Sequence, residues 1–147
     1  RGQSWALYGF TLSYLHTKDD AFLETAERVA NYFIANIPES GLIPVDFRQP
    51  MEIDLVDSTA AAIASCGLIE LSRLTEGRQS RIYLEAALKM LRTIEEECFC
   101  WNELEDNFLT RCTAAYHDRE HEFSIIYGDY YFLEALMKLA GKELFIW

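Results

Sequence analysis

The sequence lacks the segments that would place the chain in a membrane. No apolar run reaches the roughly 20 residues that a membrane-spanning helix needs, and no signal peptide or lipid-anchor signal is visible. We therefore expect no membrane association. Because the chain begins with Arg1 and not with Met, the sequence leaves an upstream segment open.

Motifs of the large enzyme classes are also missing. The sequence contains no P-loop, no dinucleotide-binding fingerprint, no nucleophile elbow and no HExxH zinc motif. Acidic residues are plentiful, but the carboxylate pair that ordinary glycosidases use cannot be picked out among them. The motifs therefore predict no catalytic residue and no cofactor.

Positive charge is scarce in this sequence. The 13 Lys+Arg residues oppose 24 Asp+Glu residues, which gives a formal net charge of -11. No Lys/Arg cluster interrupts the acidity, so we expect no nucleic-acid partner. An anionic ligand would have to be captured by a local Arg.

The cysteines show no metal-site spacing. Cys98 and Cys100 form a C-x-C pair, and no His stands at ligand spacing beside them. We predict no metal site and four free thiols, with Cys66 in the core. Free thiols are typical of a reducing compartment, so the predicted location is cytoplasmic.

What the sequence does contain is helical periodicity along nearly all of its 147 residues, half of which are hydrophobic. Helices are predicted over 5–16, 21–33, 58–74, 82–94 and 128–139. In the first of them, the expected apolar stripe consists of Trp5, Tyr8, Leu12 and Leu15. No segment alternates as a strand would, so the predicted fold is all-α.

The predicted helices repeat along the chain. Segments 21–33 and 82–94 share an aromatic-Leu-Glu-x-Ala start, and each follows a helix rich in small residues. A recurring helix pair is typical of a toroid or solenoid of αα-hairpins. Each hairpin needs neighbours to bury its faces. We therefore expect this chain to be part of something larger, either lacking an N-terminal half or forming a homo-oligomer.

The first residues carry groups suited to binding a sugar acid. Arg1 offers a planar charged fork for a carboxylate. Trp5 lies one helical turn along on the same face and could stack on a sugar ring, while Gln3 could hydrogen-bond hydroxyls. The alternative interpretation is a core Trp5 and a solvated Arg1.

Other candidate residues lie in the long connections and at helix starts. In the segment 97–127, His117 could orient a substrate and Tyr116 could donate its hydroxyl, although a plain surface histidine is the alternative. Asp57 is interpreted first as the N-cap of the 58–74 helix and second as a site residue. Asp129 is expected to complement the dipole of the last helix or to line a pocket.

Four blocks resemble, in order, the C-terminal part of the unsaturated glucuronyl hydrolases, glycoside hydrolase family 88. They are RGQSWALYGF, NYFIANIPESGLIPVDF, DSTAAAIASCGLIEL and SIIYGDYYFLEALMKL. The first looks like the family's R-G-Q-A-W block with Ser4 in place of Ala, whereas Val45 and Val56 replace an aromatic and an Arg. The resemblance implies that residues 1–147 are the C-terminal part of one (α/α)6-barrel catalytic domain.

The resemblance also implies a substrate and a reaction. The substrate would be the 4,5-unsaturated uronic acid that ends oligosaccharides made by polysaccharide lyases. In the family, an Asp acting as general acid and base hydrates the C4–C5 double bond. That Asp would lie upstream of this chain, so the chain alone is expected to be nearly inactive. The implied substrate-binding residues are Arg1, Gln3, Trp5, Tyr116 and His117.

Two alternatives to this function stay open. The same fold could act on unsaturated rhamnogalacturonyl products. The chain could also be a truncated helical protein that binds sugars or self-associates without catalysis.

Overall fold

The chain folds into helices joined by two long connections, in a computed structural model that describes residues 1–142. Within these residues the helices are α1 (Gly2–Thr17), α2 (Asp20–Ala35), α3 (Ser58–Leu74), α4 (Gly77–Glu97) and α5 (Ile126–Leu139). Between them the backbone of the described part forms isolated β-bridges and no longer strand. The all-α prediction is confirmed. The bounds of α3 match the predicted helix, and the other helices extend beyond their predicted ranges.

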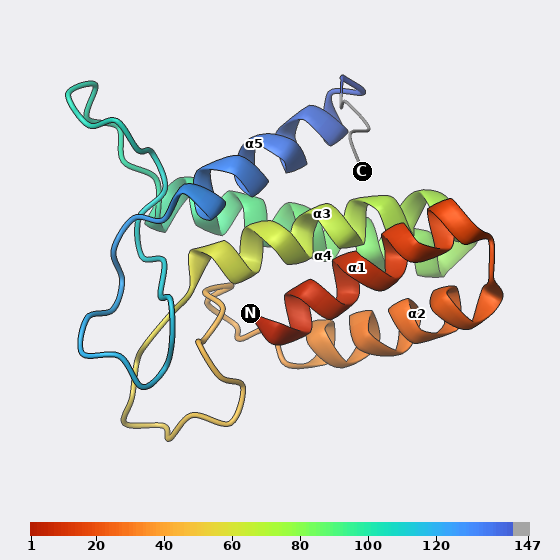
Figure 1. Cartoon of the computed structure of the whole chain (residues 1–147), viewed down its shortest axis with the longest axis horizontal. Helices are drawn as coiled ribbons and strands as arrows, with labels where there is room; N and C mark the ends of the chain where they lie inside the picture. The colour runs from red at the N-terminus through yellow and green to blue at the C-terminus, as the bar shows by residue number, and fades with distance from the viewer. Residues whose placement is uncertain (143–147) are drawn as a thin grey trace.

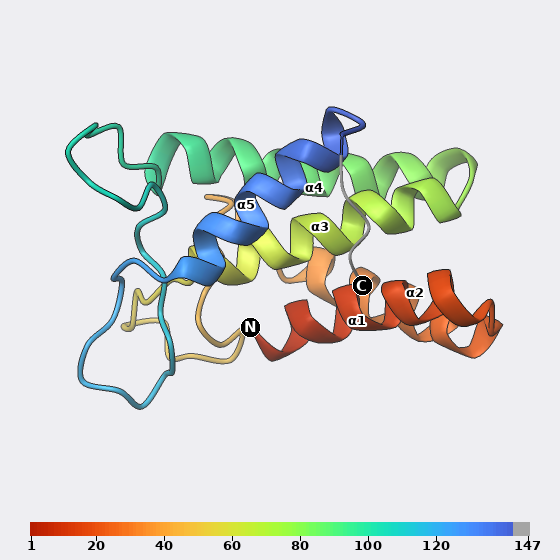
Figure 2. The ribbon, with the colours of Figure 1, turned by 45° about the horizontal axis from the view of Figure 1, so that its top comes forward.

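The helices are arranged as consecutive αα-hairpins (Figures 1 and 2). α1 pairs with α2 and α3 pairs with α4, while α3 also packs between α1 and α5. The first helices of successive hairpins therefore lie side by side in the order α1, α3, α5. This is the arrangement that the internal repeat predicts.

α3 is the central helix because its sequence has small side chains on nearly every face. All residues from Ser58 to Ser72 are buried. The backbones of α1 and α3 approach closely at Gly67, where a Cβ atom would lie 3.0 Å from Leu7 Cγ and 3.1 Å from Tyr8 Cα. Glycine is therefore needed at this crossing.

The buried stripe of α1 differs from the predicted one. Trp5 is 40% exposed, and Leu12 and Leu15 are only partly buried. The Thr11 hydroxyl donates to the Leu7 carbonyl at 2.7 Å, so a polar side chain is satisfied inside the core. The buried residues of α1 are Ser4, Leu7, Tyr8 and Thr11. Leu7 and Tyr8 lie where α1 approaches α3 at Gly67.

A buried polar cluster joins α1, α3 and α5. Lys138 Nζ lies 2.8 Å from Glu70 Oε1 and 3.3 Å from Glu134 Oε1. The Tyr8 hydroxyl donates to Glu134, and Arg73 Nη1 lies 3.2 Å from Glu70 Oε1. Both the Glu70 and the Lys138 side chains are 4% exposed. These ionised groups are paired as buried charges must be.

The first turns of α1, α3 and α5 share one end of the molecule with the long connections 36–57 and 98–125 (Figure 1). Helix N-termini carry positive partial charge, which stabilises anions close to the first turn. Each connection is closed on itself by a bridge between two of its own residues, Pro44–Val56 in the first and Cys112–Phe123 in the second. Any site built by both connections must lie here.

Other sequence predictions concern the thiols, metals and membranes. All four cysteines are free, and Cys66 lies in the core as predicted. Within residues 1–142, no three His, Cys, Asp or Glu side chains are grouped so that they could hold a metal ion. In the same residues, no helix has both the length and the apolar character needed to cross a membrane.

Candidate functional site

Arg1 and Asp57 form an ion pair at the helix-start end. Asp57 Oδ2 accepts from Arg1 Nε at 3.0 Å, and Oδ1 accepts from Arg1 Nη2 at 3.1 Å. Asp57 is 1% exposed. It occupies the N-cap position of α3, but its side chain makes no capping hydrogen bond. The predicted N-cap position of Asp57 is therefore confirmed, but the expected side-chain cap is not formed, because the carboxylate takes the stronger charge-assisted bonds that Arg1 offers.

The same carboxylate also holds the second long connection. The backbone N–H of Thr113 donates to Asp57 Oδ1 at 3.2 Å, and Arg1 Nη2 donates to the Thr113 carbonyl. The Thr113 hydroxyl donates to the Val56 carbonyl at 2.8 Å. The start of α1, the start of α3 and the 98–125 connection therefore meet at Asp57.

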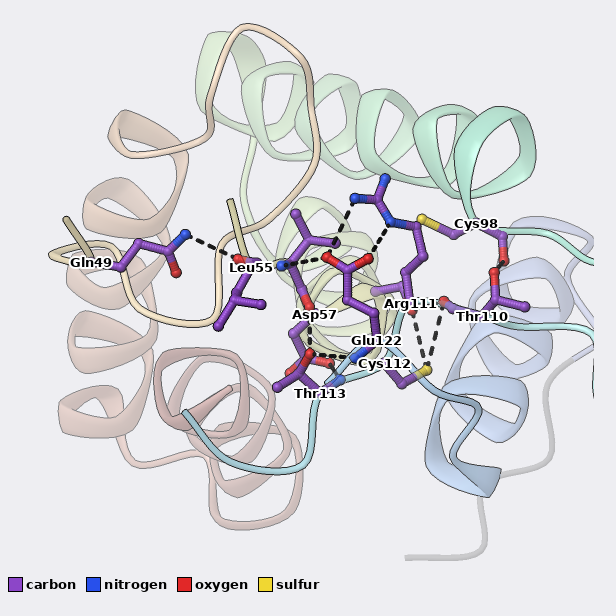
Figure 3. A network of polar contacts seen from close by, with 11 residues as sticks. Gln49, Leu55, Asp57, Cys98, Thr110, Arg111, Cys112, Thr113 and Glu122 are labelled. Carbon is purple, nitrogen blue, oxygen red and sulfur yellow. Dashed lines mark hydrogen bonds and ion pairs between the residues drawn. The ribbon is translucent and has the colours of Figure 1, made fainter. Parts of the chain in front are cut away.

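A second ion pair closes the neck of the loop 113–122. Arg111 Nε lies 3.0 Å from Glu122 Oε2, and the two side chains face each other beside Thr113 in Figure 3. This hydrogen bond raises the pKa of the Arg111 guanidinium. Both residues have a left-handed backbone, with φ of 58° and 57°. That conformation costs roughly 1–2 kcal/mol for each residue, which the pair across the neck helps to offset.

Tyr116 and His117 lie in this loop. Tyr116 is half-buried and His117 is exposed, and their rings meet edge to face at 5.2 Å. His121 Nε2 lies within hydrogen-bond distance of the Tyr116 carbonyl, at 3.2 Å. Neither Tyr116 nor His117 lines the cavity beside Arg1. The structure places them at the same end of the molecule but does not bring them into contact with the other candidates.

Arg1 and Gln3 open onto a cavity of about 360 Å³ between the start of α1, the end of α2 and the first connection. The sequence prediction assigned no binding role to segment 43–48, although the second block of the family resemblance contains residues 43–47. Val45, the departure from the family's aromatic, lies in this wall. The lining residues are Arg1, Gly2, Gln3, Tyr32, Phe33, Ile43, Pro44, Val45, Asp46, Phe47 and Arg48.

A turn fixes the outer wall of the cavity. Asp46 Oδ1 accepts from the Arg48 N–H at 2.7 Å, and the Asp46 carbonyl accepts from the Gln49 N–H at 3.0 Å. Asp side chains that bond the backbone two residues on are typical of tight turns. Phe47 packs edge to face on Phe33 at 5.1 Å, which anchors the turn to α2.

Trp5 is not among the residues that line this cavity. Its ring meets Tyr131 of α5 edge to face at 5.2 Å, and the residue is 40% exposed to solvent. Burial is the main cause that raises the pKa of Tyr131 to about 12. The backbone N–H of Trp5 donates to the Arg1 carbonyl at 3.0 Å, so both residues belong to one helical turn. The indole therefore offers a stacking surface next to the cavity and not inside it.

Asp129 has a structural role. It is 6% exposed in the first turn of α5, and Oδ1 accepts from the Leu109 N–H at 2.8 Å. It therefore ties the second connection to α5, in agreement with its predicted place at the positive end of the helix.

The guanidinium of Arg1 keeps part of its donor capacity. Of its N–H groups, the one on Nε and both on Nη2 bind Asp57 and Thr113. Nη1 makes no hydrogen bond to any of residues 1–142 that the structure describes, so it can donate to an anionic ligand. The site can thus bind and orient a carboxylate.

Comparison with known proteins identifies relatives of the whole chain. No family model matches it. The chain is 37% identical to an unsaturated glucuronyl hydrolase of Bacillus sp. (strain GL1), over 100% of the chain and 40% of that protein. It is 34% identical to an unsaturated chondroitin disaccharide hydrolase of Streptococcus pneumoniae (strain ATCC BAA-255 / R6), over 100% of the chain and 38% of that protein. The chain spans about two fifths of the length of these curated relatives.

Solved structures give the same match in three dimensions. An unsaturated glucuronyl hydrolase from Streptococcus agalactiae superposes with a TM-score of 0.89 and 30% identity, over 100% of this chain and 38% of that one. A mutant of a Streptococcus agalactiae unsaturated glucuronyl hydrolase complexed with dGlcA-GalNAc6S has a TM-score of 0.90 and 29% identity, over 99% and 40% of the two chains. These neighbours have the (α/α)6 toroid fold. The predicted partial αα-hairpin toroid is therefore confirmed.

Proposed function

We propose that this chain, which belongs to the unsaturated glucuronyl hydrolases of glycoside hydrolase family 88, supplies substrate-binding walls for a terminal unsaturated uronic acid. The proposal depends most on one observation, that Arg1 lines a cavity while keeping the N–H groups of Nη1 free of described partners. A uronic acid brings the carboxylate that these groups would bind.

Each candidate residue has a part in this proposal. Nη1 of Arg1 binds the uronate carboxylate, and the Gln3 amide hydrogen-bonds a hydroxyl or the second carboxylate oxygen. Trp5 stacks on a sugar ring at the cavity edge with its exposed face. Tyr116 and His117 contact the ligand from the loop 113–122, which the Arg111–Glu122 pair holds at its neck.

The proposed reaction is the hydration of the C4–C5 double bond of that uronic acid. We assign no catalytic residue to the described part of the chain, so its role is binding. General acid–base catalysis contributes roughly 10²–10⁴-fold to such rates. Without an acid/base Asp, the chain alone should hydrate the substrate very slowly.

The names of the relatives support a glycosaminoglycan type of substrate. One relative is named for chondroitin disaccharides, and one solved neighbour was complexed with dGlcA-GalNAc6S. These names favour the glucuronyl substrate over the rhamnogalacturonyl alternative. A cytoplasmic location, a homo-oligomer and the single incomplete domain remain predictions of the sequence.

Calorimetric titration of the chain with three disaccharides tests the proposal. The ligands are an unsaturated chondroitin disaccharide, its saturated counterpart and an unsaturated rhamnogalacturonan disaccharide. We expect the first to bind most tightly, and no loss of the double-bond absorbance during the titration. Tightest binding of the rhamnogalacturonan product, or no binding of any uronate, would overturn the proposed ligand. Rapid loss of the double bond would overturn the binding-only role.

A further inference from the structure

We propose that Asp57 is a positioning residue, which fixes the Arg1 guanidinium in the orientation that binds the uronate carboxylate. This inference rests on the proposed function, because it assigns a role to a group that supports Arg1. Among residues 1–142, Arg1 is the one cavity-lining residue to which the Asp57 carboxylate is hydrogen-bonded. It therefore acts on the ligand through Arg1.

The donor geometry restricts how Arg1 can bind. The Asp57 carboxylate accepts hydrogen bonds from Nε and from one N–H of Nη2. The Thr113 carbonyl accepts from the other N–H of Nη2. The two-nitrogen fork that Arg usually presents to a carboxylate is therefore occupied. A ligand carboxylate meets Nη1 alone. Rotation of the guanidinium would require breaking all of these bonds, so Asp57 determines where Nη1 lies.

Asp57 also sets the position of the loop relative to Arg1. Its Oδ1 atom accepts from both Arg1 and the Thr113 backbone. Thr113 begins the loop that carries Tyr116 and His117, and its hydroxyl accepts from the Glu122 N–H at 3.2 Å at the other side of the neck. One buried carboxylate thus holds both parts of the proposed binding wall at a fixed separation.

A competing interpretation gives the opposite sign. If Asp57 only neutralises Arg1, it weakens the attraction of the site for an anion, and its removal should tighten uronate binding. If Asp57 is only structural, its removal should affect charged and uncharged ligands equally. A positioning role predicts a loss for the carboxylate ligand alone. The three interpretations are separated by one pair of ligands.

The experiment compares Asp57→Asn with the matched control Asp54→Asn, which removes the same charge from an exposed position in the same connection. The ligands are an unsaturated chondroitin disaccharide and its uronate methyl ester. For Asp57→Asn we expect the affinity for the acid to fall roughly tenfold or more, the size of one lost charge-assisted hydrogen bond. Affinity for the ester, and both affinities of Asp54→Asn, should stay unchanged. Tighter acid binding, or equal losses for acid and ester, would overturn the proposal.

Arg1→Lys provides a second variant that does not disturb the charge of the pair. A lysine can pair with Asp57, but its single nitrogen cannot hold a planar donor against both Asp57 and Thr113. We expect the same acid-specific loss, and unchanged acid binding would contradict both the direct role of Arg1 and its positioning by Asp57, whereas Asp57→Asn tests the positioning alone. Failure of the unmutated chain to prefer the acid over the ester would instead refute the proposed function, so the two failures are distinguishable.

Discussion

Replacing Gly67 by Ala tests the packing of α1 on α3. The added methyl group would lie 3.0 Å from Leu7 Cγ and 3.1 Å from the Tyr8 backbone N and Cα atoms. Backbone atoms cannot rotate away as a side-chain tip can, so α1 itself must shift. Inserting a methyl group into a packed core costs typically 1–3 kcal/mol. Ala is also a better helix former than Gly by about 1 kcal/mol, which offsets part of that cost.

Gly9→Ala is the matched control for this substitution. Gly9 lies inside α1, is exposed, and has no atom within 4 Å of the added Cβ. Both variants gain the same helix propensity, so their free energies of unfolding should differ by the packing cost alone, about 1–3 kcal/mol. Urea denaturation followed by circular dichroism at the helical signal measures both. Equal stabilisation by the two substitutions would refute the close approach at Gly67.

Two further predictions concern buried ionisable groups. Lys138→Met should lower the free energy of unfolding by roughly 1–3 kcal/mol, because Glu70 and Glu134 lose a buried cation while Arg73 still pairs with Glu70. The exposed Lys89→Met should change it by less than about 0.5 kcal/mol, and similar urea midpoints for the two variants would contradict the buried cluster. Burial raises the pKa of the Cys98 thiol from 9.0 to about 11, so the folded state keeps a proton that the unfolded state releases first. The contribution of this thiol to the free energy of unfolding should therefore be fully present below pH 9 and be lost between pH 9 and 11. In Cys98→Ala, the free energy of unfolding should fall less steeply over this range. Parallel pH profiles of the urea midpoint for the unmutated chain and Cys98→Ala would contradict the role of the Cys98 thiol.

The sequence predicts the helices better than it predicts which faces they bury. The bounds of α3 follow from Asp57 and the run of small residues after it, which are local signals. The predicted buried face of α1 was wrong because the polar residues Ser4 and Thr11 are buried in the core. Hydrophobic periodicity cannot reveal polar residues whose size and local hydrogen bonds suit a close helix crossing.

The candidate site was predicted in part, for a similar reason. Arg1 and Gln3 do line a cavity, and the family resemblance points to both. The role of Asp57 could not be found, because its partners Arg1 and Thr113 are each 56 residues away along the chain. The position of Trp5 outside the cavity could not be predicted either, because its ring contacts Tyr131 of α5, which is far away along the chain.

The central claim is that the start of α1 and the first connection form a uronate-binding wall. The most direct measurement is a map of backbone amide chemical shifts during titration with an unsaturated chondroitin disaccharide. The account predicts that the changes cluster at residues 1–5, 43–48 and 113–117, and that the saturated sugar causes smaller ones. Changes confined to other segments, or none at saturating ligand, would contradict it.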